Sequence, residues 1–187
     1  MINNKSYLFL DTEYTSWEGS FERNWSDPSE FKEIVQLAAF SYSNNNENKL
    51  FNFYIKPILN PELSLYFQNL TGINQEIVNN SRNNLRTIVD FLCKLHKSHT
   101  FVSWGPDLDI LILDLNLKGI EHSIKKFEYL DFRDFLSING ISPNGLNSGN
   151  CARKIIGKNF TKYLYKDVSL MLETNPHNAI YDVMSLY

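Results

Sequence analysis

A chain of 187 residues with a formal net charge of −3 and 43% hydrophobic residues has the size and composition of one ordinary globular domain. This composition excludes extended disorder, and the lack of surplus Lys and Arg argues against a protein that coats long nucleic acid. The two cysteines, Cys93 and Cys151, form no C-x-x-C pair, which argues against a zinc site or a disulfide framework. No signal peptide or membrane-length apolar run is visible, so we expect a soluble protein in the reducing cytoplasm, with no membrane association.

Three strands are predicted in the first third of the chain. The apolar run Tyr7–Leu10 predicts the first strand, and the polar stretch Glu18–Phe31 is expected to be a long loop. Ile34–Tyr42 predicts the second strand, and Leu50–Ile55 predicts the third because it alternates and is rich in aromatic residues. The Asn-rich turn between the last two favours an antiparallel meander.

Helices and strands are expected to alternate after Pro57 and Pro61. In chain order we expect a short helix at Asn74–Val78, a helix at Arg86–His96, a strand at Thr100–Trp104, a helix at Leu108–Leu117, a strand within Phe127–Phe132, helices at Arg133–Ile138 and from Cys151–Ile156, and a last helix from near Pro176. This order predicts an α/β fold, in which a mixed sheet carries helices on both faces within a single domain over residues 1–187.

Two carboxylates follow the first predicted strand directly, in the sequence Asp11-Thr12-Glu13. Residues two apart in an extended chain point to the same face, so Asp11 and Glu13 are expected to project together. Carboxylates held that close repel each other unless a cation lies between them. A D-x-E pattern taken alone is more often a solvated strand end.

Two further polar patterns occur at the ends of predicted elements. Asp107 and Asp109 follow the strand Thr100–Trp104 and lie at the start of the next helix, where Asp is also a favoured N-cap. His177 and Asp182 lie around the start of the last helix, where they would flank a site across that helix start. Each pattern alone is weak evidence for a functional site. Together, the three patterns follow a characteristic order along the chain and lie at characteristic positions relative to the predicted strands and helices.

This set resembles the DEDDh exonucleases of the ribonuclease H-like superfamily, over nearly the full length from about Ser6. Four further segments resemble motifs of that family: Glu33-Ile34-Val35-Gln36-Leu37, Phe53-Tyr54-Ile55-Lys56-Pro57, Leu70-Thr71-Gly72-Ile73 and His177-Asn178-Ala179. Asp11–Ser20, with Trp17-Glu18-Gly19, is most similar to a bacterial branch related to the enzymes that trim small RNAs and histone mRNA 3′ ends. The family usually places its third acid four residues after the position of Trp104, which here is Leu108. We assign Asp109 to this role, with Asp107 as the alternative, because the apolar residues after Asp109 fit the family pattern better.

The resemblance implies a 3′→5′ exonuclease that uses two divalent cations, Mg²⁺ or Mn²⁺, both of which prefer oxygen ligands. Asp11, Glu13, Asp109 and Asp182 would be the metal ligands, and His177 would be the general base. The expected substrate is a single-stranded RNA or DNA 3′ end, and the products would be nucleoside 5′-monophosphates. Members of the family are often dimers, so a homodimer is one expected assembly.

Thr12, Leu70 and Ile73 are expected to frame the terminal sugar and base, and Trp17 is the preferred substrate-binding candidate for base stacking because it follows the D-x-E strand in a polar loop. Phe67 and Trp104 are further candidate surfaces for base stacking, although an aromatic residue that ends a buried strand is more often part of the core. Two other functions stay open at this point. One is a catalytically inactive nucleic-acid-binding or interaction domain, and the other is an oligoribonuclease-like hydrolase of very short RNAs. Proteins distinguish RNA from DNA by contacts to the 2′-hydroxyl. No residue type in the sequence identifies such a contact, so the sequence does not decide between the two substrates.

Overall fold

The computed structural model describes residues 6–43, 48–124, 127–157 and 177–187. Five strands form one mixed sheet in the order β3-β2-β1-β4-β5. Their bounds are β1 Ser6–Tyr14, β2 Ile34–Tyr42, β3 Lys49–Tyr54, β4 His99–Ser103 and β5 Tyr129–Asp131. The pairs β1–β2 and β2–β3 are antiparallel, whereas β1–β4 and β4–β5 are parallel. The predicted meander and the mixed α/β sheet are confirmed.

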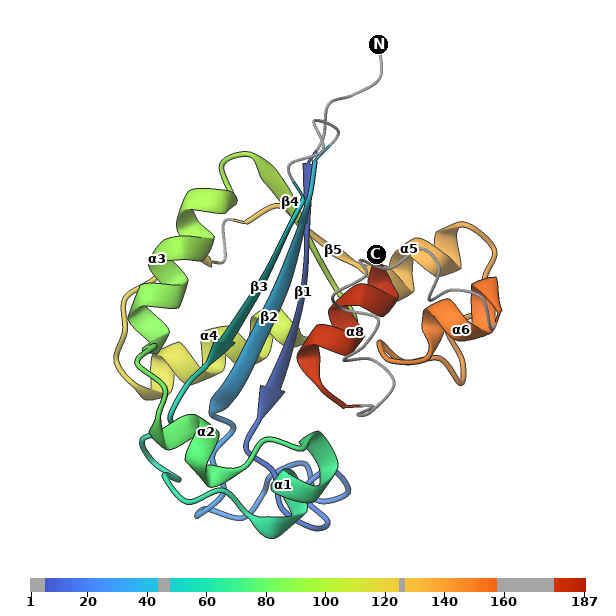
Figure 1. Ribbon diagram of the computed structural model, residues 1–187. Coiled ribbons are helices and arrows are strands. Elements are labelled where there is room, and N and C mark those ends of the chain that lie inside the picture. Colours follow the sequence, from blue (N-terminus) through green and yellow to red (C-terminus); the bar gives the residue numbers. More distant parts are fainter. Residues whose placement is uncertain (1–5, 44–47, 125–126, 158–176) are drawn as a thin grey trace.

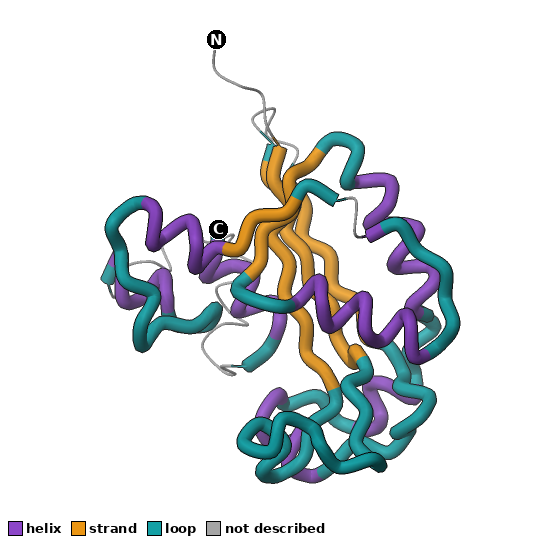
Figure 2. The backbone as a smooth tube through the Cα atoms, turned by 180° about the vertical axis from the view of Figure 1, so that it is seen from behind, coloured by secondary structure: helices purple, strands orange, loops and turns teal. Residues whose placement is uncertain are grey.

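The helices cover both faces of this sheet (Figure 1). Helices α3 and α4 lie on one face, and α5, α6 and α8 lie on the other, as the reverse view in Figure 2 also shows. The bounds of the helices are α1 Leu65–Thr71, α2 Gln75–Asn79, α3 Leu85–Leu95, α4 Asp107–Leu117, α5 Phe132–Ile138, α6 Cys151–Ile156 and α8 Ala179–Leu186. None of the described helices is long and apolar enough to cross a membrane.

The alternation of side chains along β1 divides the core into two layers. Leu8 and Leu10 are fully buried against α3 and α4, together with Leu92 and Leu111. Phe9 points to the opposite face and packs against the cluster formed by β2 and α8. Because successive residues of a strand point to opposite faces, the residues that follow Phe9 at odd positions also face α8. The strand therefore delivers Asp11 and Glu13 to the α8 face.

A buried ionic network fixes the segment between β3 and α1 next to the end of β1. The Glu33 carboxylate accepts hydrogen bonds from the backbone N–H groups of residues 58, 59 and 60, at 2.7, 3.1 and 2.6 Å. Lys118 Nζ lies 3.1 Å from Glu33 and 2.7 Å from Asp114, and all three side chains are buried. The Asp114 carboxylate also accepts a hydrogen bond from the backbone N–H of Ile34. Paired and hydrogen-bonded in this way, the charges join β2, α4 and this segment.

Helix α1 was not expected from the sequence, which predicted no helix between Pro61 and Asn74. Ser64 caps α1 by accepting a hydrogen bond from Phe67 N, and Gly72 ends it in the left-handed conformation at φ 74°. The motif Leu70–Ile73 thus contains the last residues of α1 and the two residues that follow the helix. The helix escaped prediction because it is short and only Phe67 and Thr71 are buried.

The last helix begins at Ala179 rather than near Pro176, which lies outside the described residues. Asn178 is its N-cap, and the Asn178 side chain accepts a hydrogen bond from Ile180 N at 3.1 Å. His177 therefore lies just outside the helix and not within its first turn.

Candidate active site

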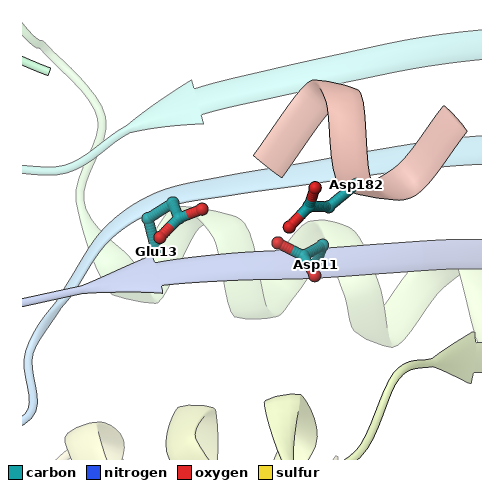
Figure 3. Close-up of side chains that lie close together, drawn as sticks. All are labelled: Asp11, Glu13 and Asp182. Atoms are coloured by element: carbon teal, nitrogen blue, oxygen red, sulfur yellow. The ribbon is translucent and has the colours of Figure 1, made fainter. Parts of the chain in front are cut away.

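The two carboxylates of β1 lie on the α8 face, as their spacing predicts (Figure 3). Asp11 is buried and Glu13 is half-buried. Helix α8 crosses this face and brings the buried Asp182 to them. One carboxylate oxygen from each of these three residues lies within 4.8 Å of the others. The structure therefore brings together three residues that the sequence predicted as metal ligands.

The third predicted ligand is where the structure departs from the assignment. Asp107, the first residue of α4, is buried and accepts two hydrogen bonds from Thr12, from its backbone N at 3.0 Å and from its Oγ1 at 2.7 Å. Asp109 is exposed and borders a separate pocket beside Ile112 and Tyr129. Two positions along a helix rotate a side chain by about 200°, so the two carboxylates point in nearly opposite directions. The geometry thus favours Asp107, the alternative that the sequence left open, over Asp109 as the proposed ligand.

Burial raises the pKa of every carboxylate in this group, and repulsion from neighbouring carboxylates adds to this effect at Asp11, Glu13 and Asp107. Burial, followed by the charges of Asp107, Asp182 and Glu13, raises the pKa of Asp11 well above its usual value. Burial, then Asp182 and Asp107, does the same for Glu13. Burial raises the pKa of Asp107 to about 7, although hydrogen bonds from Thr12 oppose the shift. Burial raises the pKa of Asp182 to about 6. Without a counter-ion, these four groups resist full ionisation at neutral pH.

A pH dependence of stability follows from these shifts. A carboxyl group whose pKa is raised on folding stabilises the fold at low pH, and this stabilisation is lost as the pH rises through the folded-state pKa. In EDTA, the free energy of unfolding should therefore fall between pH 5 and pH 8, by on the order of 2–4 kcal/mol. Urea denaturation at several pH values would measure it. Asp182→Asn should flatten the profile, and Mn²⁺ should oppose the fall. A flat profile for the unsubstituted protein in EDTA would contradict the raised pKa values.

The start of α8 is held to the sheet by Gln36, which lies opposite Glu13 in the β1–β2 pair. The fully buried Gln36 side chain accepts a hydrogen bond from Ala179 N at 3.1 Å and donates to Asn178 Oδ1 at 3.2 Å. His177, the residue before Asn178, is exposed and has a positive φ of 70°. A charged imidazole there lowers the pKa of Asp182, against the larger raising effect of burial. His177 is thus anchored beside the carboxylates through its backbone neighbours.

The residues that the sequence predicted to contact the nucleotide differ in how far they are buried. Thr12 is buried and both its donors are engaged by Asp107. Ile73 is 1% exposed and packs with Phe67 in a small apolar cluster. Ile73 therefore lies beneath the protein surface that a nucleotide would contact. Trp17 and Leu70 are both half-buried and keep exposed area, so their role in substrate contact stays a prediction.

Sequence reasoning missed Ser148 and Gly149, which lie between the predicted helices Arg133–Ile138 and Cys151–Ile156. The Ser148 hydroxyl donates a hydrogen bond to Asp182 Oδ2 at 2.8 Å. Asp182 Oδ1 is buried and has no hydrogen-bond partner among the described residues. No spacing rule connects a serine to a carboxylate that is 34 positions away along the chain, so the sequence carried no signal for this contact.

These carboxylates fit divalent cations. The donor set consists of oxygen atoms, which Mg²⁺ and Mn²⁺ prefer. A buried carboxylate oxygen without a partner, as at Asp182, is costly unless a cation or another donor satisfies it. Bound cations would also relieve the repulsion that adds to the raised pKa values of Asp11, Glu13 and Asp107.

The fold and the three gathered carboxylates agree with the predicted resemblance to the DEDDh exonucleases. A family model described as "Exonuclease" (RNase_T) matches residues 8–187, and the chain belongs to this family. The predicted resemblance is confirmed, and the protein is a hydrolase of the nuclease class. No curated protein matches the chain in sequence.

Solved structures share the fold at low sequence identity. The nuclease domain of 3′hExo, a DEDDh family member bound to rAMP, has a TM-score of 0.75 and 16% identity over 99% of this chain and 89% of that one. Cell-death related nuclease 4 (CRN-4) has a TM-score of 0.62 and 23% identity over 97% of this chain and 61% of that one. E. coli Exonuclease I in complex with a dA16 oligonucleotide has a TM-score of 0.65 and 14% identity, over 97% and 39%.

Proposed function

We propose that the protein removes nucleotides from the 3′ end of single-stranded nucleic acid and releases nucleoside 5′-monophosphates, with two divalent cations, Mg²⁺ or Mn²⁺, at the carboxylate cluster. The observation that carries this proposal is the approach of Asp11, Glu13 and Asp182 within 4.8 Å, with Asp107 buried close by. Four buried or half-buried carboxylates whose pKa values are all raised form a site that attracts divalent cations.

The roles of the ligands follow from their positions. We assign Asp11 as the ligand shared by both cations, as the resemblance to the DEDDh exonucleases implies, and the charges of Asp107, Asp182 and Glu13 all act on its carboxylate. Glu13 and Asp182 would complete the site of one cation, and Asp107 would support the other. When bound, the cations would offset the charge of the phosphodiester, favour ionisation of the attacking water and stabilise the leaving 3′ oxygen.

His177 is the proposed general base. The imidazole would take a proton from the water whose oxygen attacks the phosphorus, while the bond from phosphorus to the 3′ oxygen breaks. The released 3′ oxygen would then take a proton from solvent. An imidazole changes its charge close to neutral pH and can accept this proton there. The exposure of His177 and its charge effect on Asp182 support this role.

The choice of substrate rests on the similar structures and on charge. The matched structures hold rAMP, a histone mRNA stem-loop and a dA16 oligonucleotide, so both RNA and DNA are bound by proteins of this fold. A formal charge of −3 suits a protein that holds a few nucleotides through cations better than one that follows a long backbone. The cytoplasmic location and the homodimer stay predictions.

A degradation assay tests the proposal. Single strands of RNA and of DNA, labelled at the 3′ or the 5′ end, would be incubated with Mn²⁺, Mg²⁺ or EDTA. Stepwise shortening from the 3′ end that EDTA stops is the expected result, and strand length series would reveal any restriction to very short RNAs. Binding without cleavage under every metal condition would contradict the proposal and favour an inactive binding domain.

The third acid has its own test. Asp107→Ala should lower kcat by about a hundredfold or more, because it removes a buried ligand and leaves Thr12 without its acceptor. Asp109→Ala is the matched control, since it changes the same residue type two positions away on the exposed side of α4. Its kcat should stay within about twofold of the unsubstituted enzyme. Loss of activity in Asp109→Ala alone would restore the sequence-based assignment.

A further inference from the structure

The loop formed by residues 146–150 touches Asp182 with two neighbouring residues. The Ser148 hydroxyl donates to Oδ2 of Asp182 at 2.8 Å.

Gly149 contacts the other oxygen of the same carboxylate. A Cβ placed on Gly149 would lie 2.6 Å from Asp182 Oδ1 and 3.4 Å from Tyr181 Cε1. The first distance is shorter than any ordinary contact of a Cβ atom, so a larger residue would displace the carboxylate. The φ of Gly149 lies outside the left-handed region, which means that close approach and not backbone conformation requires glycine here.

The loop is joined to the same helix that carries Asp182. Cys151 N donates to Asn147 O at 3.0 Å, and Asn147 N donates to Asn150 Oδ1 at 3.0 Å, which closes the loop on itself. The Cys151 thiol lies 3.1 Å from the carbonyl oxygen of Ser185 on α8. Ser148 and Gly149 therefore hold a defined position relative to Asp182.

We propose that Ser148 and Gly149 are positioning residues of the metal centre, which set the orientation of the Asp182 carboxylate before a cation arrives. Ser148 holds Oδ2, and Gly149 leaves space for Oδ1, which is buried and has no hydrogen-bond partner among the described residues. Because Oδ2 of Asp182 is hydrogen-bonded and Oδ1 is not, Oδ1 is the oxygen atom that remains to bind a cation. Partners of this kind set the orientation of ligands and commonly change metal affinity by about 10–100-fold. This inference rests on the proposed metal site, but on no particular substrate.

The experiment measures Mn²⁺ binding to the full chain by calorimetry, without nucleic acid. Ser148→Ala should weaken Mn²⁺ binding by about tenfold or more, and Ser148→Thr should restore it because it keeps the hydroxyl. Gly149→Ala should weaken binding at least as much. Ser142→Ala is the matched control, since Ser142 is an exposed serine of the same stretch, and its affinity should not change.

Thermal unfolding in EDTA distinguishes a role of Ser148 in orienting the Asp182 carboxylate from a role in stabilising the loop alone. If Ser148→Ala lowers the unfolding temperature but binds Mn²⁺ as tightly as the unsubstituted protein, Ser148 only stabilises the loop and the inference is overturned. If the unsubstituted protein binds Mn²⁺ and Asp11→Asn does not, the metal centre stands whatever Ser148→Ala shows. If the unsubstituted protein binds no Mn²⁺ at all, the metal centre and this inference fail together.

Discussion

Asp11→Asn is expected to lower kcat by about a thousandfold or more, with the fold intact. Asp11 is the proposed shared ligand, so its replacement removes a ligand from both proposed cation positions. Metal ions contribute several kcal/mol to transition-state stabilisation in such sites, and each ~1.4 kcal/mol is a factor of ten in rate. Single-turnover hydrolysis of a labelled single strand in Mn²⁺ would measure the loss.

The fold of the Asp11→Asn variant should persist because Asn has nearly the same shape and carries no charge. Removing one of four mutually repelling carboxylates should even raise the unfolding temperature in EDTA at pH 8, since burial and repulsion oppose ionisation of Asp11 there. Asp90→Asn is the matched control, because Asp90 is an exposed residue of α3. Normal turnover by Asp11→Asn would contradict the two-metal assignment.

His177→Ala is expected to lower kcat by about 10²–10⁴-fold, the usual contribution of a general base. The loss should appear in kcat more than in KM, because the imidazole acts on the attacking water rather than on substrate binding. His177 is exposed, so its removal should leave the unfolding temperature close to that of the unsubstituted protein. Steady-state rates across a pH series would show whether the step that needs a neutral imidazole disappears.

The positive φ of His177 requires a second variant, because a change of backbone preference could also lower the rate. Asn adopts this left-handed conformation more readily than most residues, so His177→Asn keeps the backbone while removing the base. It should be as slow as His177→Ala. His122→Ala, at another partly exposed position, should keep the full rate. Full activity in His177→Asn would show that the backbone conformation, and not the imidazole, is what the reaction needs.

Much of the fold could be predicted because burial leaves a clear periodic signal. Ile34–Tyr42 is apolar along its length since β2 is covered on both faces, and its bounds agree with the prediction. Leu85, Ile88, Val89 and Leu92 lie at helical spacing since they form the buried side of α3. The joint projection of Asp11 and Glu13 followed from the period of a strand alone.

The rest depended on contacts that have no fixed spacing. Asp107 and Asp109 are the same residue type on the same turn of α4, and only the tertiary structure, which buries Asp107 against Thr12 and leaves Asp109 exposed, distinguishes them. The apolar pattern after Asp109 reflects how α4 packs, and it says little about where the ligand lies. The contact between Ser148 and Asp182, and the anchoring of α8 by Gln36, arise from the tertiary arrangement and could not be predicted from either segment alone.

Asp182 lies in α8 and His177 directly precedes this helix, whereas Asp11, Glu13 and Asp107 precede all of α5, α6 and α8. During synthesis, the strands can pair before α8 has been translated, because none of their hydrogen bonds involves it. A nascent chain at that stage would have its sheet and three of the four carboxylates, but neither Asp182 nor His177. The proposed metal site would then be completed only when α8 docks on β1 and β2. We expect a chain that folds in this order to have no nuclease activity until α8 has been made.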